Sequence, residues 1–181
     1  EMRKYGYHPR LAAGVVAGLY VSVQAASEIT PVRPATELLL NPGFETSTGG
    51  VPDHWYKYGG TLAQADSFVH GGAYAARFDS ASISTKWVYQ VVTVTGQVAY
   101  VFSAWALKND PNVDEVYLRV SWYESDDGSG VLMGNDDSTT RLTSEDAGYR
   151  FLTTGPITAP LGAHSARARM MLNPAGSVSC T

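Results

Sequence analysis

The sequence predicts an all-β domain, and three observations support this class. Its 181 residues include 11 tyrosines, 4 tryptophans and 18 glycines, a composition that favours strands and turns. Short segments of alternating polarity follow one another along the chain, with turn residues between them. After residue 26 no segment shows the 3.6-residue apolar period of a helix. Together these features predict a jelly-roll β-sandwich, in which two antiparallel sheets pack face to face.

The first 26 residues differ from the rest of the chain. Arg3, Lys4 and Arg10 precede an apolar run, and Gln24-Ala25-Ala26 ends it with small residues. This order is typical of a secretory signal peptide, so we expect an N-terminal hydrophobic helix over residues 1–26 and a secreted or cell-surface protein. The alternative is a retained anchor that attaches the protein to a membrane through residues 11–26, because the run is only slightly shorter than the roughly 20 residues of a spanning helix.

Residues 27–36 contain Pro31 and Pro34 and are predicted to form a linker, which leaves residues 37–181 as one domain. The whole chain has 13 basic and 17 acidic residues, and without residues 1–26 it keeps 10 and 16, a net charge of −6. An acidic domain without a basic stripe is a poor nucleic-acid binder, so nucleic acid is excluded as a partner. Because Cys180 is the single cysteine, the domain depends on its core and not on internal disulfides.

The opening stretch, residues 38–55, is the segment around which the domain is organised. Three leucines are followed by the turn residues Asn41-Pro42-Gly43, and Phe44 and Trp55 then flank a Thr/Ser/Gly loop. We expect a strand, a tight corner and an anchored loop. Glu45 has no basic neighbour in sequence, so its carboxylate needs a backbone donor, an arginine or a metal ion.

Further strands are expected near residues 73–78, 86–95, 100–108, 115–124, 149–154 and 164–172, with a hairpin in residues 126–140. Residues 115–124 give the clearest alternation. One set is apolar and predicts a core face: Val116, Leu118, Val120 and Trp122. The other set predicts a wet aromatic face: Tyr117, Arg119, Ser121 and Tyr123.

Several of these segments resemble one known family. Residues 41–45, Asn-Pro-Gly-Phe-Glu, followed by Gly50-Val-Pro-Asp-His-Trp55, are similar to the opening signature of the carbohydrate-binding modules grouped around families 4, 9 and 22. Further similar segments follow in the same order, at residues 70–78, 89–94, 100–108 and 116–122. The resemblance covers residues 38–181 and implies a galactose-binding-like β-sandwich.

The resemblance also implies two features that this sequence meets only in part. Members of the family close with a strand of the type Val-Tyr-Phe-Asp-Asp-Val, which is not found before Thr181. The domain is therefore expected to lack its last strand, unless a longer chain or a partner chain supplies it. In the family an Asp of that strand helps the opening Glu to hold calcium, so Glu45 becomes a candidate ligand of one structural calcium ion; the alternative is a carboxylate that caps loop amides.

Glycan binding is the functional hypothesis that the residues favour. Aromatic rings stack on the apolar faces of sugars, and amide, guanidinium and carboxylate groups bind the hydroxyls. The candidate carbohydrate-binding residues are Trp87, Gln90, Tyr117, Arg119, Tyr123 and Arg169. The resemblance to the family implies that Trp87 and Gln90 form an aromatic and polar pair in one cleft. Strict alternation places them on opposite faces, so this pairing requires a β-bulge.

Catalysis is not expected. No pair of carboxylates is identifiable at glycosidase spacing, the histidines after residue 26 are scattered, and no Gly-x-Ser-x-Gly motif occurs. We therefore predict a non-catalytic glycan-binding module of an exported or cell-surface protein, whose partner is a polysaccharide or glycan and which can be attached to a glycoside hydrolase in a longer chain. The alternative is a membrane-tethered structural or accessory subunit that uses its β-sandwich for protein contacts.

Overall fold

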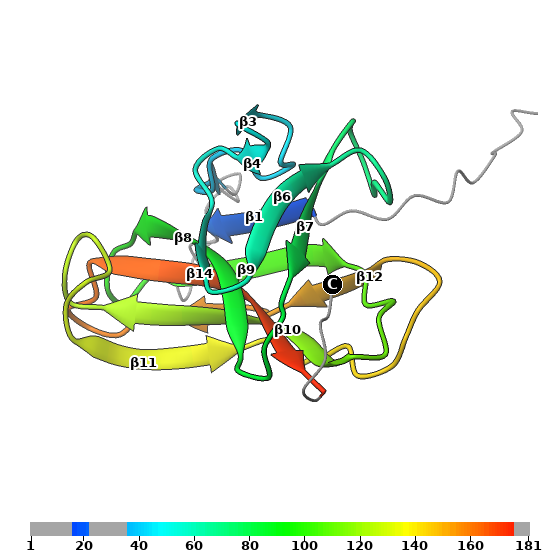
Figure 1. Cartoon of the computed structure of the whole chain (residues 1–181). Coiled ribbons are helices and arrows are strands. Elements are labelled where there is room, and N and C mark those ends of the chain that lie inside the picture. Colours follow the sequence, from blue (N-terminus) through cyan, green and yellow to red (C-terminus); the bar gives the residue numbers. More distant parts are fainter. Residues whose placement is uncertain (1–15, 22–35, 176–181) are drawn as a thin grey trace, which may run out of the picture.

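The computed structural model describes residues 16–21 and 36–175, and these residues form strands and loops without a helix (Figure 1). One five-stranded sheet has the order β12-β9-β1-β2, with β13 also paired to β9. Its strands are β1 (Val16–Val21), β2 (Thr36–Glu37), β9 (Ala99–Ala106), β12 (Arg150–Thr153) and β13 (Ile157–Thr158). We call it the β9 sheet.

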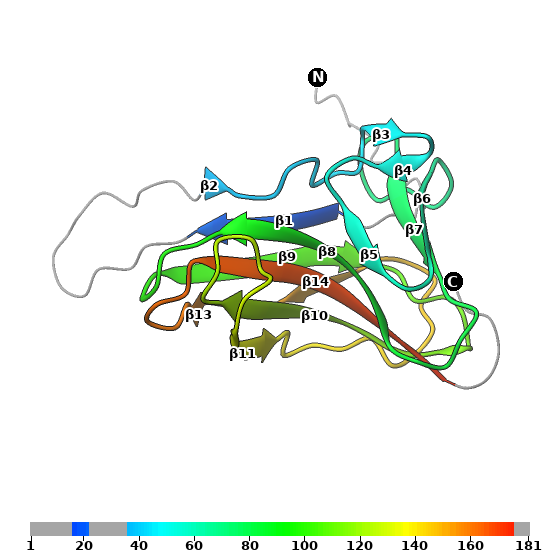
Figure 2. The same ribbon diagram turned by 60° about the vertical axis from the view of Figure 1, so that its left-hand side comes forward.

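The other five-stranded sheet has the order β11-β10-β14-β8-β5 and is called the β10 sheet. Its strands are β5 (Tyr56–Tyr58), β8 (Lys86–Thr93), β10 (Val113–Tyr123), β11 (Leu132–Asp137) and β14 (Ser165–Pro174). Two short hairpins, β3 (Ser47–Thr48) with β4 (Val51–Pro52) and β6 (Thr61–Ala65) with β7 (Ala75–Asp79), lie together at one end of the sheets (Figure 2). All strand pairs are antiparallel, which confirms the all-β class with antiparallel sheets.

The core lies between the two large sheets. Leu118, Val120 and Trp122 of β10 are buried there against residues of β9 and β12, including Phe102 and Leu152. Alternate side chains of one strand point to opposite faces of a sheet, so this burial confirms the core face predicted for residues 115–124. Tyr117, Arg119, Ser121 and Tyr123 alternate with them and lie on the outer face of the β10 sheet.

The opening stretch forms the predicted corner. The Phe44 N–H donates to the Asn41 carbonyl at 3.1 Å, and both residues have positive φ. Trp55 donates from its indole Nε1 to the same carbonyl at 3.0 Å, and its ring lies 4.9 Å from that of Phe44. The strand predicted for the three leucines, residues 38–40, is not formed: the strand here is Thr36–Glu37, which pairs with β1, and the leucines follow it outside any strand.

The N-terminal segment differs from its prediction where it is described. Val16–Val21 form strand β1, paired along its length with β9, and not a hydrophobic helix. Val, Leu and Tyr favour extended structure, and a sheet position satisfies their backbone groups. The other residues of 1–26, most of the linker, and residues 176–181 lie outside the described residues, so the signal peptide, the anchor and the missing closing strand stay predictions. Within the described ranges there is no helix that could span a membrane.

Candidate functional site

The outer face of the β10 sheet gathers aromatic and arginine side chains from four strands. The strand register places Tyr58, Trp87, Met171 and Tyr117 in one row across the sheet, and Tyr56, Tyr89, Arg169, Arg119 and Asp137 in the next. Arg167 and Tyr123 lie further along the same face. We call this set the aromatic–arginine face: Tyr56, Tyr58, Trp87, Tyr89, Tyr117, Arg119, Tyr123, Arg167 and Arg169.

The β5 edge of the face provides accessible rings. Tyr58 stacks on Trp87 with 4.0 Å between ring centroids and 7° between planes, and Tyr56 lies 5.8 Å from Tyr89. The two β5 tyrosines are 60% and 55% exposed. Such rings form a platform on which a flat apolar surface can stack.

Two arginines of β14 occupy the centre of the face. The Arg169 guanidinium lies 5.1 Å from the Trp87 ring centroid and donates to the Tyr123 hydroxyl. The Arg167 guanidinium lies between two rings, 5.2 Å from Tyr89 and 5.0 Å from Tyr123. Both side chains are half-buried, and contact with the rings fixes their orientation.

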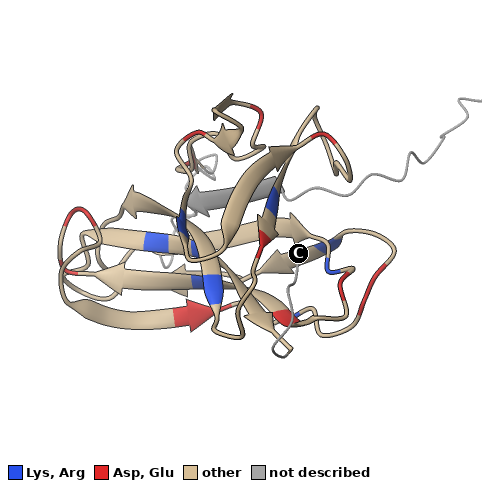
Figure 3. Ribbon diagram, in the orientation of Figure 1, with Lys and Arg blue, Asp and Glu red and all other residues tan. Residues whose placement is uncertain are grey.

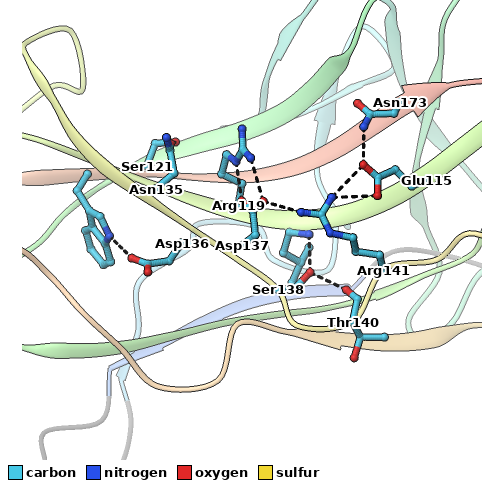
Figure 4. A network of polar contacts seen from close by, with 12 residues as sticks. Glu115, Arg119, Ser121, Asn135, Asp136, Asp137, Ser138, Thr140, Arg141 and Asn173 are labelled. Atoms are coloured by element: carbon cyan, nitrogen blue, oxygen red, sulfur yellow. Dashed lines mark hydrogen bonds and ion pairs between the residues drawn. The ribbon is translucent and has the colours of Figure 1, made fainter.

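A charge network flanks the face on the β11 side (Figure 4). Arg119 donates to both carboxylate oxygens of Asp137, at 2.6 and 2.9 Å. Arg141 donates to Glu115 at 2.9 Å and to Asp137 at 2.7 Å, and its guanidinium lies 3.9 Å from the Tyr117 ring centroid. Hydrogen bonding to Arg119 lowers the pKa of Asp137 below its ordinary value, and the same bond raises the pKa of Arg119.

Further polar contacts surround β11, on both faces of the β10 sheet. Asp136 and Asp137 belong to β11, where Asp136 accepts a hydrogen bond from the buried Trp122 indole at 2.6 Å. Ser121 donates to Asn135 at 2.5 Å, and Asn173 donates to Glu115 at 2.6 Å. The contacts of Asn135 and Glu115 orient side chains that border the aromatic–arginine face, whereas Asp136 faces the core with Trp122.

The structure brings together five of the six predicted carbohydrate-binding residues. Trp87, Tyr117, Arg119, Tyr123 and Arg169 all lie on the aromatic–arginine face. Tyr117 and Tyr123 are only 5% and 7% exposed, so their rings support the face more than they offer open surface.

Gln90 lies on the opposite side of the β10 sheet. The pairing of β8 with β14 runs without a register shift, so the required bulge is absent and Gln90 points away from Trp87. Its side chain accepts from the Leu40 N–H at 2.8 Å and donates to the Leu40 carbonyl at 2.7 Å. Gln90 is therefore an internal anchor of the opening stretch and not part of the aromatic–arginine face.

Glu45 caps loop amides in the described part of the chain. The Ala73 N–H lies 3.0 Å from Oε2 and the Tyr74 N–H lies 3.4 Å from Oε1. Calcium requires several oxygen ligands, and no group of three or more acidic, His or Cys residues that could hold a metal occurs among residues 16–21 and 36–175. A calcium ion at Glu45 would therefore need backbone carbonyls, amide oxygens or groups outside these residues as its other ligands, and calcium binding stays a prediction.

Sequence reasoning did not select Tyr56, Tyr58 or Arg141 as site residues. Tyr56-Lys57-Tyr58 carries a signal, because alternation around Lys57 places both tyrosines on one face. No sequence signal marks Arg141 as a site residue, because it reaches the face from a loop after β11.

The structure also contains an apolar cavity of about 280 Å³ near the β6–β7 hairpin. Its lining includes Phe78, Val116, Tyr149 and Met170. Most of its walls are apolar core side chains, whereas the aromatic–arginine face combines exposed rings with fixed donors. The open face is therefore the stronger candidate for a ligand that carries hydroxyl groups.

Comparisons with known proteins identify the fold. The sequence matches no family model, and none of the curated proteins matches it. The C-terminal family 22 carbohydrate-binding module of Clostridium thermocellum Xyn10B matches the structure with a TM-score of 0.51 and 14% identity, over 76% of this chain and 84% of that chain. The chain therefore has a fold similar to that of a carbohydrate-binding module.

Two further solved structures are similar at slightly lower scores. A family 16 carbohydrate-binding module matches with a TM-score of 0.47 and 14% identity, over 73% of this chain and 91% of that chain. The N-terminal family 22 and catalytic modules of Clostridium thermocellum xylanase 10B, complexed with xylohexaose, match with a TM-score of 0.49 and 16% identity, over 70% of this chain and 24% of that chain. The resemblance expected from the sequence motifs is confirmed at the level of fold.

Proposed function

We propose that this protein is a non-catalytic glycan-binding module that binds its ligand on the aromatic–arginine face. The observation that carries the proposal is the exposed Tyr58 ring stacked on Trp87, in the same row as Tyr117 and beside the donors of Arg169 and Arg119. A sugar ring stacks on the β5 tyrosines, and the guanidinium groups bind its oxygens. The similarity in fold to a carbohydrate-binding module supports the same conclusion.

The acidic groups beside the face support a role in binding without catalysis. A glycosidase needs one carboxyl group as an acid and a second as a base or nucleophile. Glu115 and Asp137 are instead held by Arg141 and Arg119, in contacts of 2.6–2.9 Å. Hydrogen bonding to Arg119 lowers the pKa of Asp137, which opposes a role as general acid.

The proposal includes export, with residues 1–26 as the signal segment and the module acting outside the cell or at its surface. Mass spectrometry of the mature protein from its native host tests this part, since a chain that still begins at residue 1 contradicts cleavage. A module that keeps an attached enzyme near its polysaccharide raises the local concentration of substrate.

The binding test uses a panel of soluble polysaccharides in affinity gel electrophoresis, followed by isothermal titration calorimetry. We expect Tyr58→Ala to weaken binding roughly tenfold, which corresponds to about 1.4 kcal/mol for the loss of one stacking ring. Phe151→Ala is the matched control, because Phe151 is a 48% exposed ring on the β9 sheet. Binding that survives both Tyr58→Ala and Trp87→Ala, or that Phe151→Ala weakens as much, contradicts the proposal.

A further inference from the structure

The aromatic–arginine face carries an unbalanced positive charge on an otherwise acidic protein. The chain has a net charge of −4, yet four arginines lie on or beside this face: Arg119, Arg141, Arg167 and Arg169. Two acids, Asp137 and Glu115, pair with Arg119 and Arg141. In the described part of the chain Arg167 and Arg169 form no ion pair. Figure 3 shows a basic position within β14 and the acidic end of β11.

The position of Arg169 makes this charge costly. Arg169 is the direct cross-strand neighbour of Arg119 in the pairing of β14 with β10. Like charges directly opposite each other destabilise a sheet. Burial lowers the pKa of Arg169 below its ordinary value, and repulsion from Arg167 and Arg119 acts in the same direction.

Polar atoms without partners point to the same place. Four buried side-chain atoms in the described ranges lack a hydrogen-bond partner: Trp87 Nε1, Arg167 Nε, Arg169 Nε and Asn173 Oδ1. All four residues lie on β8 or β14 with side chains on the outer face of the β10 sheet, and three of the four atoms are donors. A buried donor without an acceptor is unfavourable, so these side chains lack acceptor groups in the protein itself. The Nε atoms are enclosed, and a ligand would have to reach the two arginines through their terminal nitrogens.

The nearest acidic loop does not neutralise the two arginines. Gly128 covers Arg167, because a Cβ at Gly128 would lie 3.1 Å from Arg167 Nε. In the same loop Asp127 accepts hydrogen bonds from Ser129, and Asp126 lies 3.8 Å from His164. The positive charges of Arg167 and Arg169 are therefore available to pair with a ligand.

We propose that the glycan bound by this face is acidic, a polysaccharide whose sugars carry carboxylate groups, and that Arg169 with Arg167 binds the carboxylate. This inference rests on the proposed function and adds the chemical class of the ligand. The planar guanidinium fork matches a carboxylate with two parallel hydrogen bonds, and the rings of Trp87, Tyr89 and Tyr123 hold the two forks in place. Stacking on the β5 tyrosines then selects a sugar carboxylate over a small anion.

The experiment compares each acidic polysaccharide with its own carboxyl-reduced form. Polygalacturonate and alginate are titrated against the full chain by calorimetry, together with the neutral polymers made from them by carboxyl reduction, at low and at physiological salt. We expect carboxyl reduction to weaken binding at least tenfold. Arg169→Gln is expected to lose this discrimination and to bind the acidic and the reduced polymer about equally.

Arg150→Gln is the matched control. It removes one positive charge from the β9 sheet, where the exposed Arg150 pairs with Asp146, and it should keep the preference for the acidic polymer. Thermal melting verifies that each variant is folded. If Arg169→Gln fails to fold, Arg169→Lys keeps the charge without the fork and should lose most of the discrimination.

The outcomes separate this inference from the proposed function. Equal binding of acidic and reduced polymers by the unmodified protein, with weakening by Tyr58→Ala, overturns the acidic ligand and leaves glycan binding intact. Binding that Arg150→Gln weakens as much as Arg169→Gln shows general charge attraction and also overturns the inference. If the protein binds dextran sulfate in preference to both uronate polymers, the anion that it recognises is a sulfate ester. That result overturns the inference of a carboxylate ligand. If no glycan binds, both proposals fail.

Discussion

Replacing Gln90 by alanine tests whether this residue anchors the opening stretch or binds a ligand. Gln90 is 4% exposed and makes two hydrogen bonds to the backbone of Leu40, 50 residues earlier in the chain. These two bonds join β8 to the corner that contains Asn41 and Phe44. The alanine variant removes both bonds without touching the aromatic–arginine face.

The expected loss of stability follows from these contacts. Each hydrogen bond contributes about 1 kcal/mol net, and leaving the Leu40 N–H and carbonyl without partners adds a desolvation penalty of about 1 kcal/mol or more. We expect the free energy of unfolding to fall by about 2–4 kcal/mol. For a domain of this size the melting temperature should fall by roughly 5–15 °C.

Differential scanning calorimetry and urea unfolding measure this loss, and polysaccharide titration at a temperature where the variant is folded measures binding. Thr93→Ala is the control, since Thr93 is an exposed residue of the same strand. The reasoning is refuted if Gln90→Ala melts close to the unmodified protein while its affinity for glycan falls.

Two further predictions concern Asp137 and Glu45. The pKa of Asp137 is lowered in the folded state, so its contribution to stability is present above the unfolded value of 3.8 and is lost as pH falls through the folded value. Asp137→Asn should lower the free energy of unfolding by about 1–2 kcal/mol at pH 7 and flatten the pH dependence of stability below pH 4. Urea unfolding at a series of pH values measures both effects. A variant whose stability falls with acid as steeply as that of the unmodified protein would contradict the role of this ion pair. The oxygens of Glu45 accept from backbone N–H groups, so the melting temperature should be equal with calcium and with EGTA. Glu45→Gln should lower the melting temperature. A rise of several degrees with calcium would instead indicate a calcium site at Glu45.

Local pattern was sufficient to predict the class and the strongest strands. The alternation of residues 115–124 identified both faces of β10, because a period of two fixes which side chains share a side. Trp122 is buried as predicted, at 1% exposure. Trp105 has no polar neighbours in sequence that mark its side, and β9 directs it to the outer side, where it stacks on His70 at 4.4 Å.

The candidate site was predictable only as far as strand periodicity extends. Periodicity places Trp87, Tyr117 and Arg169 on outer faces but does not say which strands are neighbours, so their meeting depends on the sheet order. The partners of Gln90 and Arg141 come from distant segments, and no local signal marks them. Strict alternation correctly predicted that Gln90 and Trp87 lie on opposite faces of the sheet. The resemblance to the family had suggested that they share one cleft.

The position of β1 has a consequence if residues 1–26 are a cleaved signal segment, as we propose. Among the described strands β2 joins its sheet only through β1, and β1 pairs with β9 from Val16↔Trp105 to Val21↔Tyr100. Cleavage by signal peptidase after Ala26 would remove this strand. The backbone N–H and C=O groups of β9 that pair with β1 would then be unpaired and able to bind another extended peptide. Residues 16–21 therefore cannot both be removed with a signal segment and pair with β9. A mature protein without them would need another strand beside β9, or another segment that covers this edge.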